Sequence, residues 1–244
     1  MTPEEVYREL EKDVRDVGEW WKAKREMQVR IAKYTIKLPR TTWFEYTSKR
    51  KNRYLLMSVI LGRKYNDESF TCLLALQKAD RGYAVYTTRF PWQHHAVNHA
   101  YMPHVFDQYH NPERGNVQKT GIELIKHFIE RNSYGEVSRG DQFSGRSVRY
   151  KGRDNMAKCV TDGVLLGEVV GDIFVSHTFI TYEMAGDIQR EEFEKNRGMI
   201  LSNEEILRQI KEEWKERERQ MREDIIDDIM RERECGNLVQ QCIK

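Results

Sequence analysis

The stretch from residue 157 to 182 constrains the fold more than any other part of this chain, because short turns divide it into three apolar runs. The runs span residues 157–161, 164–170 and 173–182 and are rich in β-branched and aromatic side chains. The dipeptides between them are Asp162-Gly163 and Gly171-Asp172, which are typical of two-residue hairpin turns. The sequence therefore predicts a three-stranded antiparallel meander.

A second meander is predicted closer to the N-terminus. Residues 54–61, 70–76 and 83–88 have strand-like composition, and the polar segments 62–69 and 78–82 connect them. Residues 3–32 precede it with apolar positions at helical spacing, and Thr2, Pro3 and Glu5 form a capping box with proline in the first turn. A second amphipathic helix is expected over residues 120–131.

The C-terminal part of the chain is predicted to be a long charged helix. Ser202 and Glu205 form another capping box, and several Glu/Arg and Asp/Arg pairs follow at i,i+4 spacing. The apolar stripe is narrow and consists of Ile206, Ile210, Trp214, Met221, Ile225 and Ile229. Such a stripe favours an antiparallel partner helix or a homodimer seam through residues 203–234.

These elements together predict an α+β protein with antiparallel sheets, packed helices and a long C-terminal amphipathic helix. We expect two parts, an α+β body over residues 1–186 and a charged helical appendage over residues 187–244. Residues 1–184 hold 29 Lys and Arg against 23 Asp and Glu, whereas residues 185–244 hold 12 against 16. A mildly basic body suits a nucleic acid partner.

The sequence also indicates a cellular compartment. The four cysteines, at positions 72, 159, 235 and 242, form no Cys-x-x-Cys pair, which favours reduced thiols. No apolar run approaches 18 residues, and the N-terminus is acidic and helical. We therefore expect a cytoplasmic protein without a membrane partner.

Histidine is concentrated in one segment. Five of the seven histidines lie between His94 and His110. Because imidazole can ligate a metal or transfer a proton near neutral pH, this segment is the first candidate for a functional site.

One interpretation of the segment is a metal centre. His95 and His99 are four residues apart and would share a helix face, and His104 or Asp107 could complete three ligands for zinc or another divalent metal. This arrangement would make the protein a metal-dependent hydrolase. No His-Glu-x-x-His signature is present.

A second interpretation is acid–base chemistry without a cofactor. His104-Val-Phe-Asp-Gln-Tyr opens a short helix, the helix from Gly121 to Arg131 follows, and a meander ends in His177-Thr178-Phe179-Ile180. In this order of elements, residues 100–182 resemble the RelE/barnase/colicin-type nuclease superfamily.

The resemblance implies a metal-independent nuclease. Its histidine would act on the ribose 2′-hydroxyl or the leaving oxygen, a cation would hold the phosphate, and the final strand would supply a hydroxyl or an imidazole. By position these groups are His104, an arginine, Thr178 and His177. Members of the superfamily usually place the arginine one turn after the histidine, where this chain has Gln108; Arg114 is the nearest substitute.

Two further features bear on partners. The tract Lys49, Arg50, Lys51, Asn52 and Arg53 is the densest positive charge in the chain, and it is either a solvated turn or an edge that contacts phosphates. The alternative to catalysis is a protein-binding adaptor or inhibitor, because the His- and Tyr-rich segment and the charged C-terminal helix both suit protein contacts.

Overall fold

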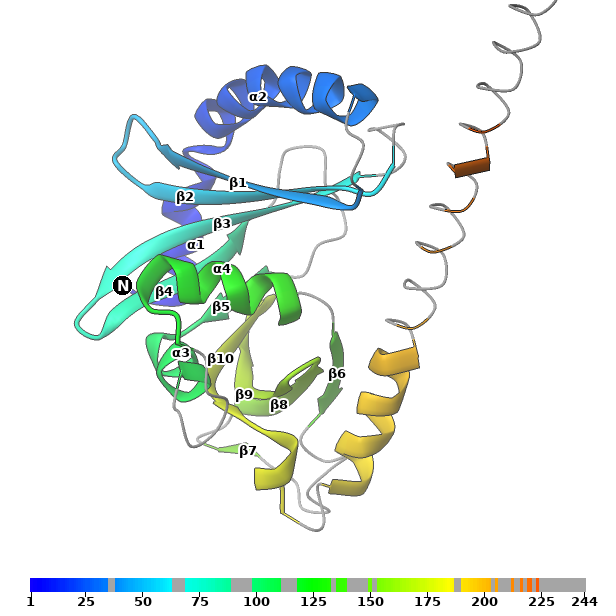
Figure 1. Ribbon diagram of the computed structural model, residues 1–244. Coiled ribbons are helices and arrows are strands. Elements are labelled where there is room, and N and C mark those ends of the chain that lie inside the picture. The colour runs from blue at the N-terminus through cyan, green and yellow to red at the C-terminus, as the bar shows by residue number, and fades with distance from the viewer. Residues whose placement is uncertain are drawn as a thin grey trace, which may run out of the picture. The chain divides into compact units, whose positions relative to one another are not determined.

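The computed structural model describes residues 1–34, 38–62, 69–88, 98–110, 118–132, 135–139, 149–150, 153–186 and 190–202, with isolated positions beyond 202 (Figure 1). The chain divides into two units, Met1–Ile200 and Leu201–Lys244. The first unit combines helices with a mostly antiparallel sheet, so the α+β fold class is confirmed.

The N-terminal region forms two helices, α1 (Pro3–Glu11) and α2 (Val14–Tyr34). The predicted capping box is present, since the Thr2 side chain accepts from the Glu5 N–H and the Glu5 side chain accepts from the Thr2 N–H. The prediction of one continuous helix is wrong, because the chain breaks at Lys12 and Asp13. Asp13 ends the first helix by donating its N–H to Leu10 O, and its own carbonyl accepts the Val17 N–H in the next helix.

The predicted first meander is confirmed and is longer than expected. Strands β2 (Arg53–Ile60), β3 (Ser69–Ala79) and β4 (Gly82–Thr88) are antiparallel neighbours. An additional strand, β1 (Arg40–Thr47), pairs with β2. Strand β1 was not predicted, because its first three residues are polar and Glu45 interrupts its aromatic residues.

The predicted second meander is also confirmed, with β8 (Arg153–Val160), β9 (Gly163–Val170) and β10 (Ile173–Ile180) in antiparallel register. Two-residue turns connect the strands, but the first is Thr161-Asp162 instead of the predicted Asp162-Gly163, since Val160 pairs with Gly163. Gly171, in the second turn, has a φ of 63°, which glycine adopts without strain. Strands β6 (Gly135–Arg139) and β7 (Arg149–Tyr150) pair with β8.

A short strand, β5 (Asn98–Tyr101), joins the two meanders into one sheet with the order β1-β2-β3-β4-β5-β10-β9-β8-β6. It is antiparallel to β4 and parallel to β10. Helix α3 (Pro103–His110) follows directly, and α4 (Gly121–Asn132) comes next. Most of the predicted histidine segment is therefore a central strand of the sheet and the helix that follows it.

Helices cover both faces of this sheet (Figure 1). On one face, apolar residues of α3 and α4, including Phe106 and Phe128, pack with Leu74 and Phe179 of the strands. On the other face, apolar residues of α1 and α2 pack with a second set of strand residues; among them are Val6, Tyr7, Trp21, Tyr54, Ala100 and Val175. Below we call these the α3–α4 face and the α1–α2 face.

A helical stretch over residues 190–202 follows the sheet. Its Phe193 and Ile200 are buried against Cys159 and Tyr182, so the body extends beyond residue 186. The predicted apolar stripe of residues 206–229 lies outside the described residues, and dimerisation through it stays a prediction. Within the part of the chain that the structure describes, no helix is long and apolar enough to cross a membrane.

Candidate functional site

The residues predicted to form a histidine site are distributed over several environments. His99 lies on β5 and is buried, whereas His104 and Asp107 are exposed on α3. His95 and Arg114 lie outside the described residues. Among the residues that are described, no group of three His, Cys, Asp or Glu side chains is placed to hold a metal ion.

His99 is a packed side chain at the junction of the two meanders. Its Nε2 lies 2.7 Å from Ser176 Oγ on β10, and its ring stacks on Tyr101 at 3.8 Å and contacts Phe174. Burial, aided by the charge of Lys158, holds the pKa of His99 well below its ordinary value. His99 is therefore neutral near pH 7 and ties β5 to β10.

His104 and Asp107 lie three residues apart on the exposed side of α3. Neither forms a hydrogen bond or ion pair with another described residue. Tyr109, on the opposite side of α3, fixes the helix against the sheet. The Tyr109 ring packs on Phe179, and the Tyr109 hydroxyl donates a hydrogen bond to Asp162 Oδ2 at 2.7 Å. The helix thus presents His104 to solvent from a fixed position beside β10.

Among the predicted catalytic residues that the structure describes, His177 has the best-defined partner, the carboxylate of Glu168. His177 Nε2 lies 3.1 Å from Glu168 Oε1 on the neighbouring strand β9. The imidazole side chain is 52% exposed, whereas the carboxylate side chain is 16% exposed. A mostly buried carboxylate therefore holds an accessible imidazole in one orientation.

A β-bulge in β10 creates this arrangement. Ser176 pairs with Gly167 and Thr178 with Leu166, so His177 is the extra residue between them. The bulge explains why Ser176 and Phe179, three positions apart, both face the α3–α4 side of the sheet. Bulges redirect side chains in this way and occur often beside active sites.

The predicted convergence of His99 with His177 is wrong, because the two side chains lie on opposite faces. Glu168, the partner of His177, is the register neighbour of Val175, which packs on the α1–α2 face. His99 stacks on Tyr101, which belongs to the α3–α4 face. No contact among the described residues joins His104 or Asp107 to His177.

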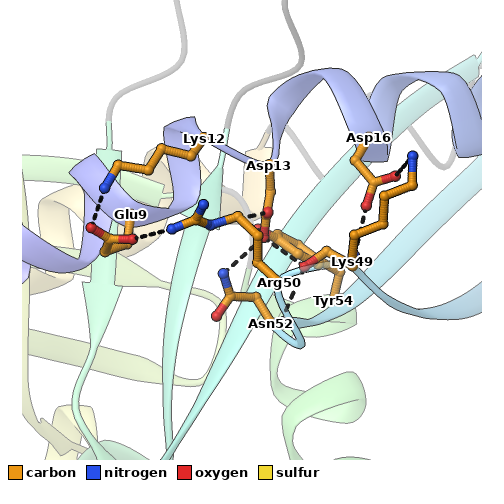
Figure 2. Close-up of polar contacts among 9 residues, drawn as sticks. Glu9, Lys12, Asp13, Asp16, Lys49, Arg50, Asn52 and Tyr54 are labelled. Carbon is orange, nitrogen blue, oxygen red and sulfur yellow. Dashed lines mark hydrogen bonds and ion pairs between the residues drawn. The ribbon is translucent and has the colours of Figure 1, made fainter.

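The basic tract lies in the turn between β1 and β2, where acidic side chains engage most of it (Figure 2). Lys49 Nζ lies 3.3 Å from Asp16, and Arg50 Nη2 lies 2.9 Å from Glu9. Arg53 faces Glu45 at 3.9 Å and the Tyr83 hydroxyl at 3.2 Å. Lys51 occupies the left-handed conformation of the turn, with a φ of 68°. These ion pairs reduce the positive charge that the tract can offer to a phosphate, and its contact with nucleic acid stays a prediction.

Asp13 is the central residue of the contact between the β1–β2 turn and the junction of α1 and α2. Its Oδ2 accepts hydrogen bonds from Ser48 Oγ at 2.7 Å, Asn52 Nδ2 at 2.8 Å and the Tyr54 hydroxyl at 2.9 Å (Figure 2). The carboxylate is 1% exposed. Burial and the neighbouring Asp13 carboxylate both raise the pKa of Tyr54, so its hydroxyl remains a donor. The tract therefore docks the β1–β2 turn onto the α1–α2 junction.

Sequence reasoning missed Glu168, although one signal could have identified it. The turn at Gly171-Asp172 fixes the hairpin register and makes Glu168 the neighbour of Val175. His177 lies two residues beyond Val175 on β10 and is therefore the diagonal neighbour of Glu168. A long side chain can reach a diagonal neighbour of this kind. The bulge brings that diagonal pair into hydrogen-bond distance.

Comparison with known proteins adds no family to this description. No family model, curated protein or solved structure matches the chain. The resemblance to the RelE/barnase/colicin-type nucleases consequently stays a prediction from the order of elements.

Proposed function

We propose that this protein is a metal-independent ribonuclease in which His177 and Glu168 carry out acid–base chemistry on a phosphodiester. The observation that carries the proposal is the half-exposed imidazole at a β-bulge, bound by a mostly buried carboxylate. A proton-transfer group held in position in this way can contribute about a hundred- to ten-thousand-fold in rate.

The hydrogen bond to Glu168 defines the role of each imidazole nitrogen. A carboxylate accepts hydrogen bonds, so Nε2 carries a proton and Nδ1 has a free lone pair. In the proposed reaction Nδ1 removes the proton of a ribose 2′-hydroxyl, whose oxygen attacks the adjacent phosphorus. The bond from phosphorus to the 5′-oxygen breaks, that oxygen takes up a proton, and a 2′,3′-cyclic phosphate is formed.

Other predicted residues supply the remaining roles of the proposal. Thr178 follows His177 and can donate its hydroxyl to a phosphate oxygen. His104 lies on α3, on the opposite face of the sheet from Glu168, so it is not assigned to this step, and the protonated His177 is the candidate for returning a proton to the leaving oxygen. Arg114 remains the candidate for holding the phosphate, whereas the basic tract lies at the β1–β2 turn and three strands separate β2 from β10.

The order of elements gives independent support. Between residues 100 and 182 two helices precede an antiparallel meander, and the last strand carries His177 and Thr178. This is the order on which the resemblance to the nuclease superfamily rests.

The test is an incubation of the protein with labelled RNA and with DNA of the same sequence, with and without EDTA. We expect cleavage of RNA in both conditions, products that end in a 2′,3′-cyclic phosphate, and intact DNA, because DNA has no 2′-hydroxyl. Intact RNA in all conditions would reject the proposal. Cleavage that EDTA abolishes would point instead to the metal-dependent hydrolase.

A protein-binding adaptor is the second candidate. Two apolar side chains near the end of the first unit, Met184 and Met199, are each 42% exposed. Exposed apolar residues close to a charged helical segment suit a protein partner. Recovery of one stoichiometric protein partner, together with intact RNA in the cleavage assay, would favour this function.

A further inference from the structure

The orientation of His177 depends on where the bulge in β10 falls. Ser176, the residue before the bulge, is the last residue of β10 that pairs with both neighbouring strands, with β9 and with β5. Pairing with β9 resumes at Thr178. A bulge that moved by one residue would pair His177 directly with Gly167 or Leu166 of β9, and the close approach to Glu168 would be lost.

Two hydrogen bonds hold Ser176 to the β5 segment. Ser176 is completely buried, and its Oγ lies 2.7 Å from His99 Nε2. Its carbonyl oxygen accepts the Met102 N–H at 2.9 Å. Both the side chain and the main chain of β10 are therefore fixed at the position immediately before the extra residue.

His99 is itself held from several sides. Its ring stacks on Tyr101 at 3.8 Å and lies 4.7 Å from the Phe174 ring. Its N–H donates to Thr87 Oγ1 at 2.9 Å, and its carbonyl oxygen accepts the Tyr7 hydroxyl at 2.9 Å. The imidazole that bonds Ser176 is thus a rigid partner, tied to α1 and β4 as well as to β10.

These contacts make other positions of the bulge unfavourable. A shift of the strand at Ser176 would separate its hydroxyl from His99, and both polar groups are buried, so neither could find water in exchange. An unpaired polar group costs most in such a low-dielectric environment. The hydrogen bond therefore favours the one arrangement in which His177 is the extra residue.

We propose that His99 and Ser176 are positioning residues of the candidate site, because their buried hydrogen bond fixes the bulge that holds His177 beside Glu168. The two residues act through the main chain of β10, from the opposite face of the sheet, and do not touch the substrate. The catalytic consequence rests on the proposed ribonuclease function, whereas the geometric consequence is measurable without any activity.

The geometric test is an NMR measurement of the nuclear Overhauser effect between the ring protons of His177 and the side-chain protons of Glu168. We expect Ser176→Ala to weaken this signal several-fold. Ser58→Ala is the matched control, since Ser58 is an equally buried serine on β2, and it should leave the signal unchanged. An unchanged signal in Ser176→Ala would overturn the proposal, and so would an equal loss in both variants, because general loosening would then explain it.

The kinetic test compares RNA cleavage by wild type, Ser176→Ala, His99→Leu and His99→Gln. Misplacement of a catalytic group by about 1 Å costs about a hundredfold in rate, so we expect a loss of that size in kcat for the first two variants, with KM nearly unchanged. His99→Gln should retain most of the rate, because an amide can still bond the serine hydroxyl.

The outcomes of the two tests are distinguishable. A wild-type kcat in Ser176→Ala and His99→Leu would overturn the proposal, and equal losses in His99→Leu and His99→Gln would assign the effect to ring packing instead of the hydrogen bond. Intact RNA with the wild-type protein would reject the ribonuclease function, and the comparison of Ser176→Ala with Ser58→Ala by NMR would then decide the positioning role alone.

Discussion

The histidines of this protein show how position in the fold decides what one side chain can do. His99 is enclosed between aromatic rings and a serine hydroxyl, and burial keeps it neutral. His177 is half exposed beside a carboxylate, and His127 lies against an ammonium group. The same imidazole therefore stabilises the sheet at one position and is accessible for proton transfer at another.

His99 should make the stability of the protein depend on pH. Its pKa is lower in the folded state than in the unfolded state, where it has the ordinary value of about 6.5. Between the two pKa values the unfolded state binds more protons, so stability is fully present above about pH 6.5 and declines as the pH falls below it. The slope from this residue is at most about 1.4 kcal/mol per pH unit.

Urea unfolding of wild type and His99→Gln at several pH values between 5 and 8 measures this contribution. Glutamine can still form a hydrogen bond with Ser176 but does not titrate. Below pH 6.5 the free energy of unfolding of the variant should therefore depend less steeply on pH than that of wild type. Parallel stability curves for the two proteins would show that His99 is not the residue responsible.

At the level of elements, the docking of the β1–β2 turn on α1 and α2 depends on one buried carboxylate. Asp13 accepts three hydrogen bonds on a single oxygen and lies 3.9 Å from Arg50. The surrounding ion pairs, such as Glu9 with Arg50, are much more exposed. Most of the energy of this contact should therefore reside in Asp13.

We predict that Asp13→Asn destabilises the protein by about 2 to 4 kcal/mol. An amide offers one acceptor oxygen without a charge, and its NH₂ group would face other donors in a buried site. Glu9→Gln is the control and should cost less than about 1 kcal/mol, because its ion pair is exposed to solvent. Chemical denaturation of both variants gives the two values, and equal losses would refute the central role of Asp13.

The elements that follow local rules could be predicted from the sequence, and those that depend on distant partners could not. The turn residues near Asp162 and at Gly171-Asp172 indicated the second meander, although the first turn lies one residue earlier than predicted, and Thr2 with Glu5 specified the first helix start. The break at Asp13 was missed because its cause is a hydrogen-bond network with a turn more than thirty residues away. His177 was predicted as a site residue, but its partner Glu168 was missed, because a bulge in β10 brings the two side chains into contact.

At the level of the whole molecule, the first unit depends on a short central strand. Among the described strands, β5 is the one that pairs with both meanders, and it is parallel to β10. Parallel pairing between distant segments has no local sequence signature, so two separate meanders were predicted where one sheet exists. The His-rich segment is therefore central to the fold, whereas the His177–Glu168 pair lies outside it.

The C-terminal unit, Leu201–Lys244, carries the prediction for assembly. Removal of residues 203–244 deletes the predicted apolar stripe and leaves Phe193 and Ile200 in place. Light scattering should show a dimeric mass for the full chain and a monomeric mass for the truncated chain. The same number of subunits in both would exclude dimerisation through residues 203–234.

The central claim is that His177 and Glu168 act as one unit in RNA cleavage. The direct measurement is the initial rate of RNA cleavage by wild type, His177→Ala, Glu168→Gln and the double variant, with Glu123→Gln as an exposed glutamate control. We predict a loss of about a hundred- to ten-thousand-fold for His177→Ala and no further loss in the double variant, because groups that act together are not additive. The claim would be contradicted if His177→Ala cleaved RNA at the wild-type rate. It would also be contradicted if the fold-loss of the double variant equalled the product of the losses of the two single variants.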